Sequence, residues 1–174
     1  MIIRRELILS GAAAILAAIL PEHAHAADDP TAILTAIYAR VIKGKGDGGG
    51  TFVIDTKAAR TKYLSNSLAT LWAKADARTR KGDGGPIGFD PVTNSQDPDV
   101  KSYKIVAEKQ AADKATMAVT IEAHQSAART NAADKTIRYD FVLEAGQWKI
   151  DDIKGAVDGR PWSVRALLVE SFKH

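Results

Sequence analysis

The chain contains no cysteine among its 174 residues. No disulfide bond can therefore stabilise the fold, and neither a cysteine nucleophile nor a thiolate metal site is available. A lipid-modified amino terminus of the bacterial lipoprotein kind is excluded as well, because a cysteine carries the lipid. The hydrophobic core must hold the fold without covalent cross-links.

The chain also has few histidines and a small net charge. The formal net charge is +3, from 24 basic and 21 acidic residues. This small excess, with no basic stripe interleaved with aromatic residues, argues against a nucleic-acid-binding protein. Beyond the first 26 residues the histidines are His124 and His174, which are too few for a usual zinc site. We expect neither a metal nor a cofactor.

No apolar run is long enough to span a bilayer comfortably. Leu7–Leu20 has about 14 residues, against the ~20 of a membrane-spanning helix. A basic head with Arg4 and Arg5 precedes it, and the small-x-small motif Ala24–Ala26 follows it. These features predict a signal peptide cleaved after Ala26 and a periplasmic or secreted protein without a membrane anchor. A retained anchor is the alternative. The general secretory and twin-arginine routes both remain open.

Removal of the first 26 residues leaves 148 of 174, the size of one domain spanning residues 27–174. Helical spacing of apolar residues predicts helices at Pro30–Lys43, capped by Asp29, then at Lys57–Leu64 and Ser67–Lys81. Thr51–Asp55 is predicted to be a short strand or an extended segment. Gly82–Val100 is predicted to be a long loop.

Alternation of apolar and polar residues predicts a run of strands after these helices. They are Ser102–Gln110, Ala115–His124, Thr136–Glu144 and Gln147–Lys154. Val164–Phe172 is predicted to be a closing helix or a last strand. Helices followed by an antiparallel meander predict an α+β fold, with N-terminal helices packed on a curved antiparallel sheet. Such a sheet can form a cone whose mouth binds small ligands.

Several short motifs resemble a family of bacterial envelope proteins. They are Tyr63–Ser65 with Leu68 and Leu71, Phe89–Pro91 with Asn94, Gln96 and Asp97, and the ending Gly146–Ile153. That family has no known function and a cystatin-like cone fold, similar to nuclear transport factor two and scytalone dehydratase. The resemblance covers about residues 30–172 and implies the cone, but no catalytic residue. Family members are mostly secreted or lipid-anchored, so the missing cysteine indicates a soluble periplasmic form.

Asp152 is the strongest single candidate for chemistry. Alternation along Gln147–Lys154 places it on the apolar face with Trp148 and Ile150, and places Asp151 on the solvent face. A carboxyl group buried there would have a raised pKa and could act as an acid or a base. The alternative is that Asp152 caps the following turn or pairs with an arginine of a helix.

Aromatic and loop residues supply the other candidates. Tyrosines with an aspartate at the mouth of the cone would form a polar ligand pocket, although most aromatic residues are expected in the core. The candidate ligand-binding residues are Asp152, Tyr63, Trp72, Tyr139, Asp90, Asn94, Gln96 and Asp97. The loop Asp90–Asp99 is rich in oxygen ligands for calcium, but it does not match the spacing of a calcium-binding hand. Turn chemistry explains this loop without a metal.

These features favour an exported, non-enzymatic binding or accessory module that recognises an envelope protein or a small ligand. One alternative is a small dehydratase, isomerase or hydrolase that uses Asp152 with a pocket tyrosine. Another is an inhibitor or immunity-like protein of an envelope enzyme. A homodimer formed through the sheet is left open, and no nucleic-acid partner is expected.

Overall fold

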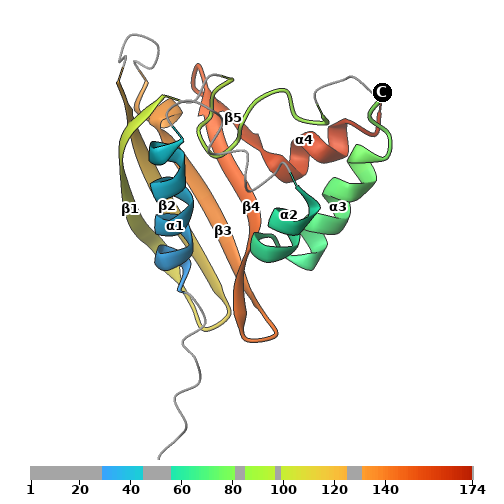
Figure 1. Cartoon of the computed structure of the whole chain (residues 1–174), viewed down its shortest axis with the longest axis horizontal. Coiled ribbons are helices and arrows are strands. Elements are labelled where there is room, and N and C mark those ends of the chain that lie inside the picture. Colours follow the sequence, from blue (N-terminus) through green and yellow to red (C-terminus); the bar gives the residue numbers. More distant parts are fainter. Residues whose placement is uncertain (1–28, 45–55, 81–84, 97–98, 125–130, 174) are drawn as a thin grey trace, which may run out of the picture.

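The computed structural model describes residues 29–44, 56–80, 85–96, 99–124 and 131–173. The predicted signal peptide, Thr51–Asp55 and Asp97 lie outside these residues. The described chain is an α+β fold in which helices pack on a five-stranded antiparallel sheet (Figure 1). None of its helices is long and apolar enough to cross a membrane.

In the described part of the chain, three helices precede the sheet: α1 (Pro30–Lys43), α2 (Lys57–Tyr63) and α3 (Asn66–Asp76). Asp29, Thr56 and Ser65 cap them by accepting a backbone N–H hydrogen bond within the first turn. The predicted positions are thus confirmed, with one correction. Helix α3 ends at Asp76 and not at Lys81, because residues 77–80 offer no large apolar side chain to the core.

The strands lie in the sheet in chain order, each antiparallel to the next: β1 (Val100–Gln110), β2 (Lys114–Ala123), β3 (Thr136–Glu144), β4 (Gln147–Val157) and β5 (Arg160–Ser163). A 3-10 turn, η3 (Ala132–Lys135), precedes β3. The segment after β5 is a helix, α4 (Val164–Glu170), which decides between the two predictions made for it.

Strand β5 escaped prediction although its turn has a sequence signal. Asp158 (φ 51°) and Gly159 (φ 74°) both adopt the left-handed conformation that a two-residue hairpin turn requires. Ala145 (φ 48°) and Gly146 (φ 76°) do the same between β3 and β4. An Asp-Gly pair between two short segments therefore marks a hairpin here.

The core lies on one face of the sheet, beneath α1 (Figure 1). The ring of Tyr38 in α1 lies 5.2 Å from that of Tyr103 in β1 and 6.3 Å from that of Tyr139 in β3. The opposite face carries polar side chains, including Thr116, which hydrogen-bonds Asp140. The sheet is not strongly curled, and the described residues do not show the cone that the resemblance implies.

Candidate functional site

A β-bulge at Asp151 changes the geometry predicted for β4. Phe141 lies opposite Ile150 but Asp140 lies opposite Asp152, so Asp151 is an extra residue in the ladder. Residues opposite one another point to the same face of a sheet, and Asp152 therefore shares the face of Asp140. The prediction that Asp152 lies on the face of Ile150 is wrong, because strict alternation cannot reveal an inserted residue.

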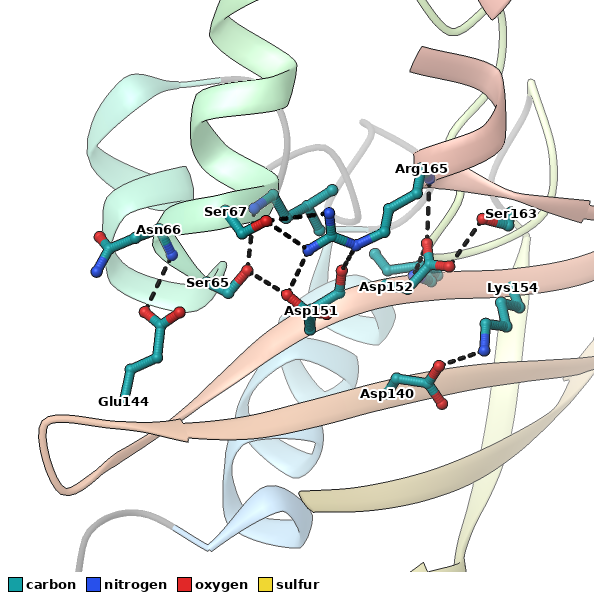
Figure 2. A network of polar contacts seen from close by, with 12 residues as sticks. Ser65, Asn66, Ser67, Asp140, Glu144, Asp151, Asp152, Lys154, Ser163 and Arg165 are labelled. Atoms are coloured by element: carbon teal, nitrogen blue, oxygen red, sulfur yellow. Dashed lines mark hydrogen bonds and ion pairs between the residues drawn. The ribbon is translucent and has the colours of Figure 1, made fainter. Parts of the chain in front are cut away.

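Asp152 is buried and accepts three hydrogen bonds from the protein (Figure 2). Its Oδ1 accepts from the backbone N–H of Ile153 at 2.9 Å and of Arg165 at 3.1 Å. Its Oδ2 accepts from the hydroxyl of Ser163 at 2.7 Å. Ser163 in turn accepts from the N–H of Ala166 and caps α4. Asp152 thus ties the start of α4 to β4.

Asp151 makes the equivalent connection to α3, and the prediction that it simply faces solvent is wrong. The hydroxyl of Ser65 donates to Asp151 Oδ1 at 2.6 Å and accepts from the N–H of Leu68 at 3.0 Å. Arg165 forms an ion pair with Asp151 and donates from Nε to its backbone carbonyl at 2.6 Å. Both terminal nitrogens of Arg165 also lie 3.2 Å from the hydroxyl oxygen of Ser67 (Figure 2).

These residues form one connected set, which we call the β4 polar network: Ser65, Ser67, Asp151, Asp152, Ser163 and Arg165. Prediction from the sequence singled out Asp152 and placed Asp151 on the solvent face. It did not find Ser163 or Arg165. Ser163 precedes an apolar helical run, which is a capping signal, whereas nothing local indicates that Arg165 reaches Asp151.

The β4 polar network closes one edge of the sheet. Beside it, the N–H of Ser65 donates to the carbonyl of Ile150 at 2.8 Å, so that Leu64 and Ile150 form a parallel bridge. Further along β4, residues 154–157 pair with β5. The outer edge of β4 is thus covered by the α2–α3 junction and then by a short strand.

A second polar group lies in the interior beneath residues 85–96. The hydroxyl of Tyr38 donates to the carbonyl of Val92 at 2.8 Å. The hydroxyl of Tyr139, 2.9 Å from that of Tyr38, is therefore the donor of that second bond. Asp90 accepts from the N–H of Val92 at 2.9 Å and from the hydroxyl of Thr93 at 2.8 Å. The bond from Tyr38 anchors the loop to α1, and the bonds of Asp90 hold the turn within the loop.

Burial dominates the electrostatics of this interior group. Desolvation raises the pKa of Asp90 above its usual value, although hydrogen bonds from Val92 and Thr93 oppose the rise. Burial also raises the pKa of Tyr139 well above its usual range, and the neighbouring Tyr38 and Asp90 add to that rise. Tyr139 therefore keeps its proton and remains a hydrogen-bond donor.

The remaining candidates belong to other parts of the fold. The side-chain amide of Asn94 donates to the carbonyl of Ala156 at 2.7 Å and accepts from the indole N–H of Trp162 at 3.0 Å. Gln96 donates to the carbonyl of Gly88 at 3.3 Å. Asn94 therefore anchors the loop to β4 and β5.

Tyr63 and Trp72 belong to α2 and α3. The ammonium group of Lys62 lies 4.9 Å from the ring centre of Tyr63. The guanidinium of Arg60 lies 5.0 Å from that of Trp72, whose buried indole N–H has no acceptor among the described residues. Neither aromatic residue takes part in the β4 polar network.

Within the part of the chain that the structure describes, no group of three or more potential ligands could hold a metal ion. Comparison with protein-family models, curated proteins and solved structures finds no match for this chain. The function must therefore be inferred from the geometry of its own residues.

Proposed function

We propose that this protein is an exported, non-enzymatic binding module of the bacterial envelope, and that it contacts its partner through the free edge of β1. The observation that carries this proposal is the difference between the two edges of the sheet. On the other side of the sheet, a helix junction and a polar network cover part of β4, and the outermost strand, β5, has only 4 residues. The edge at β1 has no such cover in the described residues.

Strand β1 has 11 residues, and among the described strands it pairs with β2 alone. Its outer edge forms no backbone hydrogen bond with another described element. Packing of Tyr103 against Tyr38 holds the strand from its inner face. A fixed strand with unpaired backbone groups can bind an extended segment by strand addition, in which main-chain hydrogen bonds supply affinity.

The geometry gives less support to the enzyme alternative. That alternative needs Asp152 beside Tyr63 or Tyr139 at an open pocket. Asp152 instead accepts bonds from two backbone amides and a serine on the face opposite the core. The contacts of Asp151 and Asp152 join β4 to α3 and α4, which is a structural task.

The proposal also includes export by a signal peptide and a relationship with the cystatin-like folds. The basic head, apolar run and Ala24–Ala26 motif support cleavage of a signal peptide and a periplasmic or secreted location. The order of a long helix followed by an antiparallel meander supports a relationship with the cystatin-like folds. The cone that this relationship implies belongs to the same proposal, as does a single domain at residues 27–174.

Site-specific photo-cross-linking in intact cells tests this function. Three valines of nearly equal exposure make matched positions: Val106 in β1 (46%), Val157 in β4 (48%) and Val169 in α4 (49%). A photoreactive residue at Val106 is expected to capture a discrete partner, whereas those at Val157 and Val169 are not. Capture of the same proteins from all three positions, or from none, contradicts the proposal.

A further inference from the structure

We infer that the segment added to β1 is an extended acidic one, in which acidic residues alternate with apolar ones. This partner chemistry rests on the proposed binding function of the β1 edge. It follows from the charge of β1, from the two faces that β1 presents to a neighbouring strand, and from the repulsion expected with a second copy.

The charge on the edge is positive. Lys101, Lys104 and Lys109 are exposed, and none forms an ion pair with a residue in the described ranges. Glu108, the acidic residue of β1, is held by two hydrogen bonds from Nε of Arg138 at 2.9 and 3.0 Å. Carboxylates on an incoming strand would therefore meet unpaired ammonium groups.

The faces of β1 explain the alternation. Lys104 lies opposite Thr120 on the polar face, whereas Tyr103 and Ile105 lie opposite Ile121 and Val119 on the core face. A strand beside β1 would place alternate side chains next to these two sets. Acidic residues suit the Lys104 side, and apolar residues suit the side of Tyr103 and Ile105.

The register sets the length of the added segment. Register shifts at Lys101 and Glu108 leave Ser102–Ala107 as the regular part of β1. This part spans about 20 Å at roughly 3.3 Å per residue, enough to pair with a segment of similar length. Lys101 and Lys109 flank it, so further acidic residues are favoured at the ends of the segment.

The same lysines disfavour a second copy of this chain. Two β1 strands placed side by side would bring their lysines together, and like charges on neighbouring strands are destabilising. Lysine on an edge strand is a recognised means of preventing self-association. The edge therefore excludes its own copy while it admits a strand of opposite charge.

Binding of synthetic peptides, followed by fluorescence anisotropy, tests this partner chemistry. The first probe alternates glutamate and valine, and the second has lysine in place of glutamate. The third is the first peptide with alternate backbone nitrogens methylated, which removes its hydrogen bonds along one edge. The glutamate peptide is expected to bind, whereas the other two bind at least about tenfold more weakly.

Matched variants locate the peptide on the protein. Lys104→Glu with Lys109→Glu is expected to weaken binding of the glutamate peptide by about tenfold or more. Lys57→Glu with Lys74→Glu makes the same change in net charge on α2 and α3, and is expected to leave binding within about twofold. The inference would be overturned if both pairs of substitutions weakened binding of the glutamate peptide equally. It would also be overturned if the lysine peptide or the methylated peptide bound as tightly as the glutamate peptide.

The two proposals fail separately. If Val106 captures a partner but the glutamate peptide does not bind, the acidic partner chemistry is wrong and the proposed function stands. If Val106 captures no partner and the glutamate peptide does not bind, both the proposed function and the acidic partner chemistry are wrong.

Discussion

At the scale of single residues, Asp151 and Asp152 show how adjacent carboxylates can serve two helices. Ser65 and Ser163 each accept an N–H bond at a helix start and donate their hydroxyl proton to one of these aspartates. Each serine thus both caps a helix and fixes it to β4. The two carboxylates thus hold two different helices to the same strand.

Replacement of Asp152 should cost stability. In Asp152→Ala, the N–H groups of Ile153 and Arg165 and the hydroxyl of Ser163 lose their acceptor. We expect the free energy of unfolding to fall by about 1–3 kcal/mol, the usual cost of unsatisfied buried polar groups. Urea denaturation measures this change. The control is Asp113→Ala in the exposed β1–β2 turn, and a loss for Asp152→Ala no larger than for this control would contradict the structural role.

The buried Asp90 should make stability depend on pH. Burial raises the pKa of Asp90 in the folded state above its unfolded value of about 3.9. The Asp90 carboxyl therefore keeps its proton to a higher pH in the folded state than in the unfolded state. Stability should therefore fall as pH rises from below the unfolded pKa through the folded pKa.

The variant Asp90→Asn should lack this fall, because its side chain does not ionise. Denaturation of both proteins at a series of pH values gives the difference between them. This difference should shift in favour of the variant as pH rises. A difference that is constant with pH, or one that shifts toward the wild type, is incompatible with a raised pKa for Asp90.

At the scale of elements, the hairpin of β4 and β5 depends on Gly155. A Cβ atom at this position would lie 2.5 Å from Cζ2 and 2.8 Å from Cε2 of the Trp162 side chain. The Trp162 ring also packs at 72° against Phe89, with ring centres 5.0 Å apart, and donates to Asn94. Gly155 thus makes room for the ring that joins β5 to the loop.

Gly155→Ala should therefore displace Trp162 and destabilise the fold by about 1–3 kcal/mol, as overpacking usually does. Denaturation gives the free energy, and tryptophan fluorescence reports the displacement. Gly88→Ala is the matched control, because nothing lies within 4 Å of its added Cβ. Equal effects of the two substitutions would show that the contact with Trp162 is unimportant.

Sequence patterns predict elements better than their connections. The apolar stripe of α1 and the alternation in β1 to β4 are local signals, and the structure confirms the positions of these elements. The bulge at Asp151 depends on pairing with Asp140 and Phe141 across the ladder, so alternation along β4 alone misplaces Asp152. The bond from Arg165 to Asp151 likewise depends on how α4 packs, which no local pattern contains.

At the scale of the whole molecule, the two edges of the sheet have different surroundings. Helices α2 and α3 meet β4 near the bulge, and α4 follows β5 on the same side, whereas β1 ends the sheet on the other side (Figure 1). Open edges promote unwanted pairing, and lysine is one protection against it. Strand β1 is long and positively charged, and no described element covers its outer edge. These features favour selective addition of a partner strand over an edge that is merely protected against unwanted pairing.

Amide hydrogen exchange along β1, measured by NMR on the isolated protein at two concentrations, tests the openness of this edge most directly. Within Ser102–Ala107, successive N–H groups point alternately toward β2 and away from it. We predict alternating slow and fast exchange along this stretch, unchanged by concentration, beside slow exchange in central β3. Uniformly slow exchange, or protection that increases with concentration, would mean that the edge is already paired and is not free to bind a partner strand.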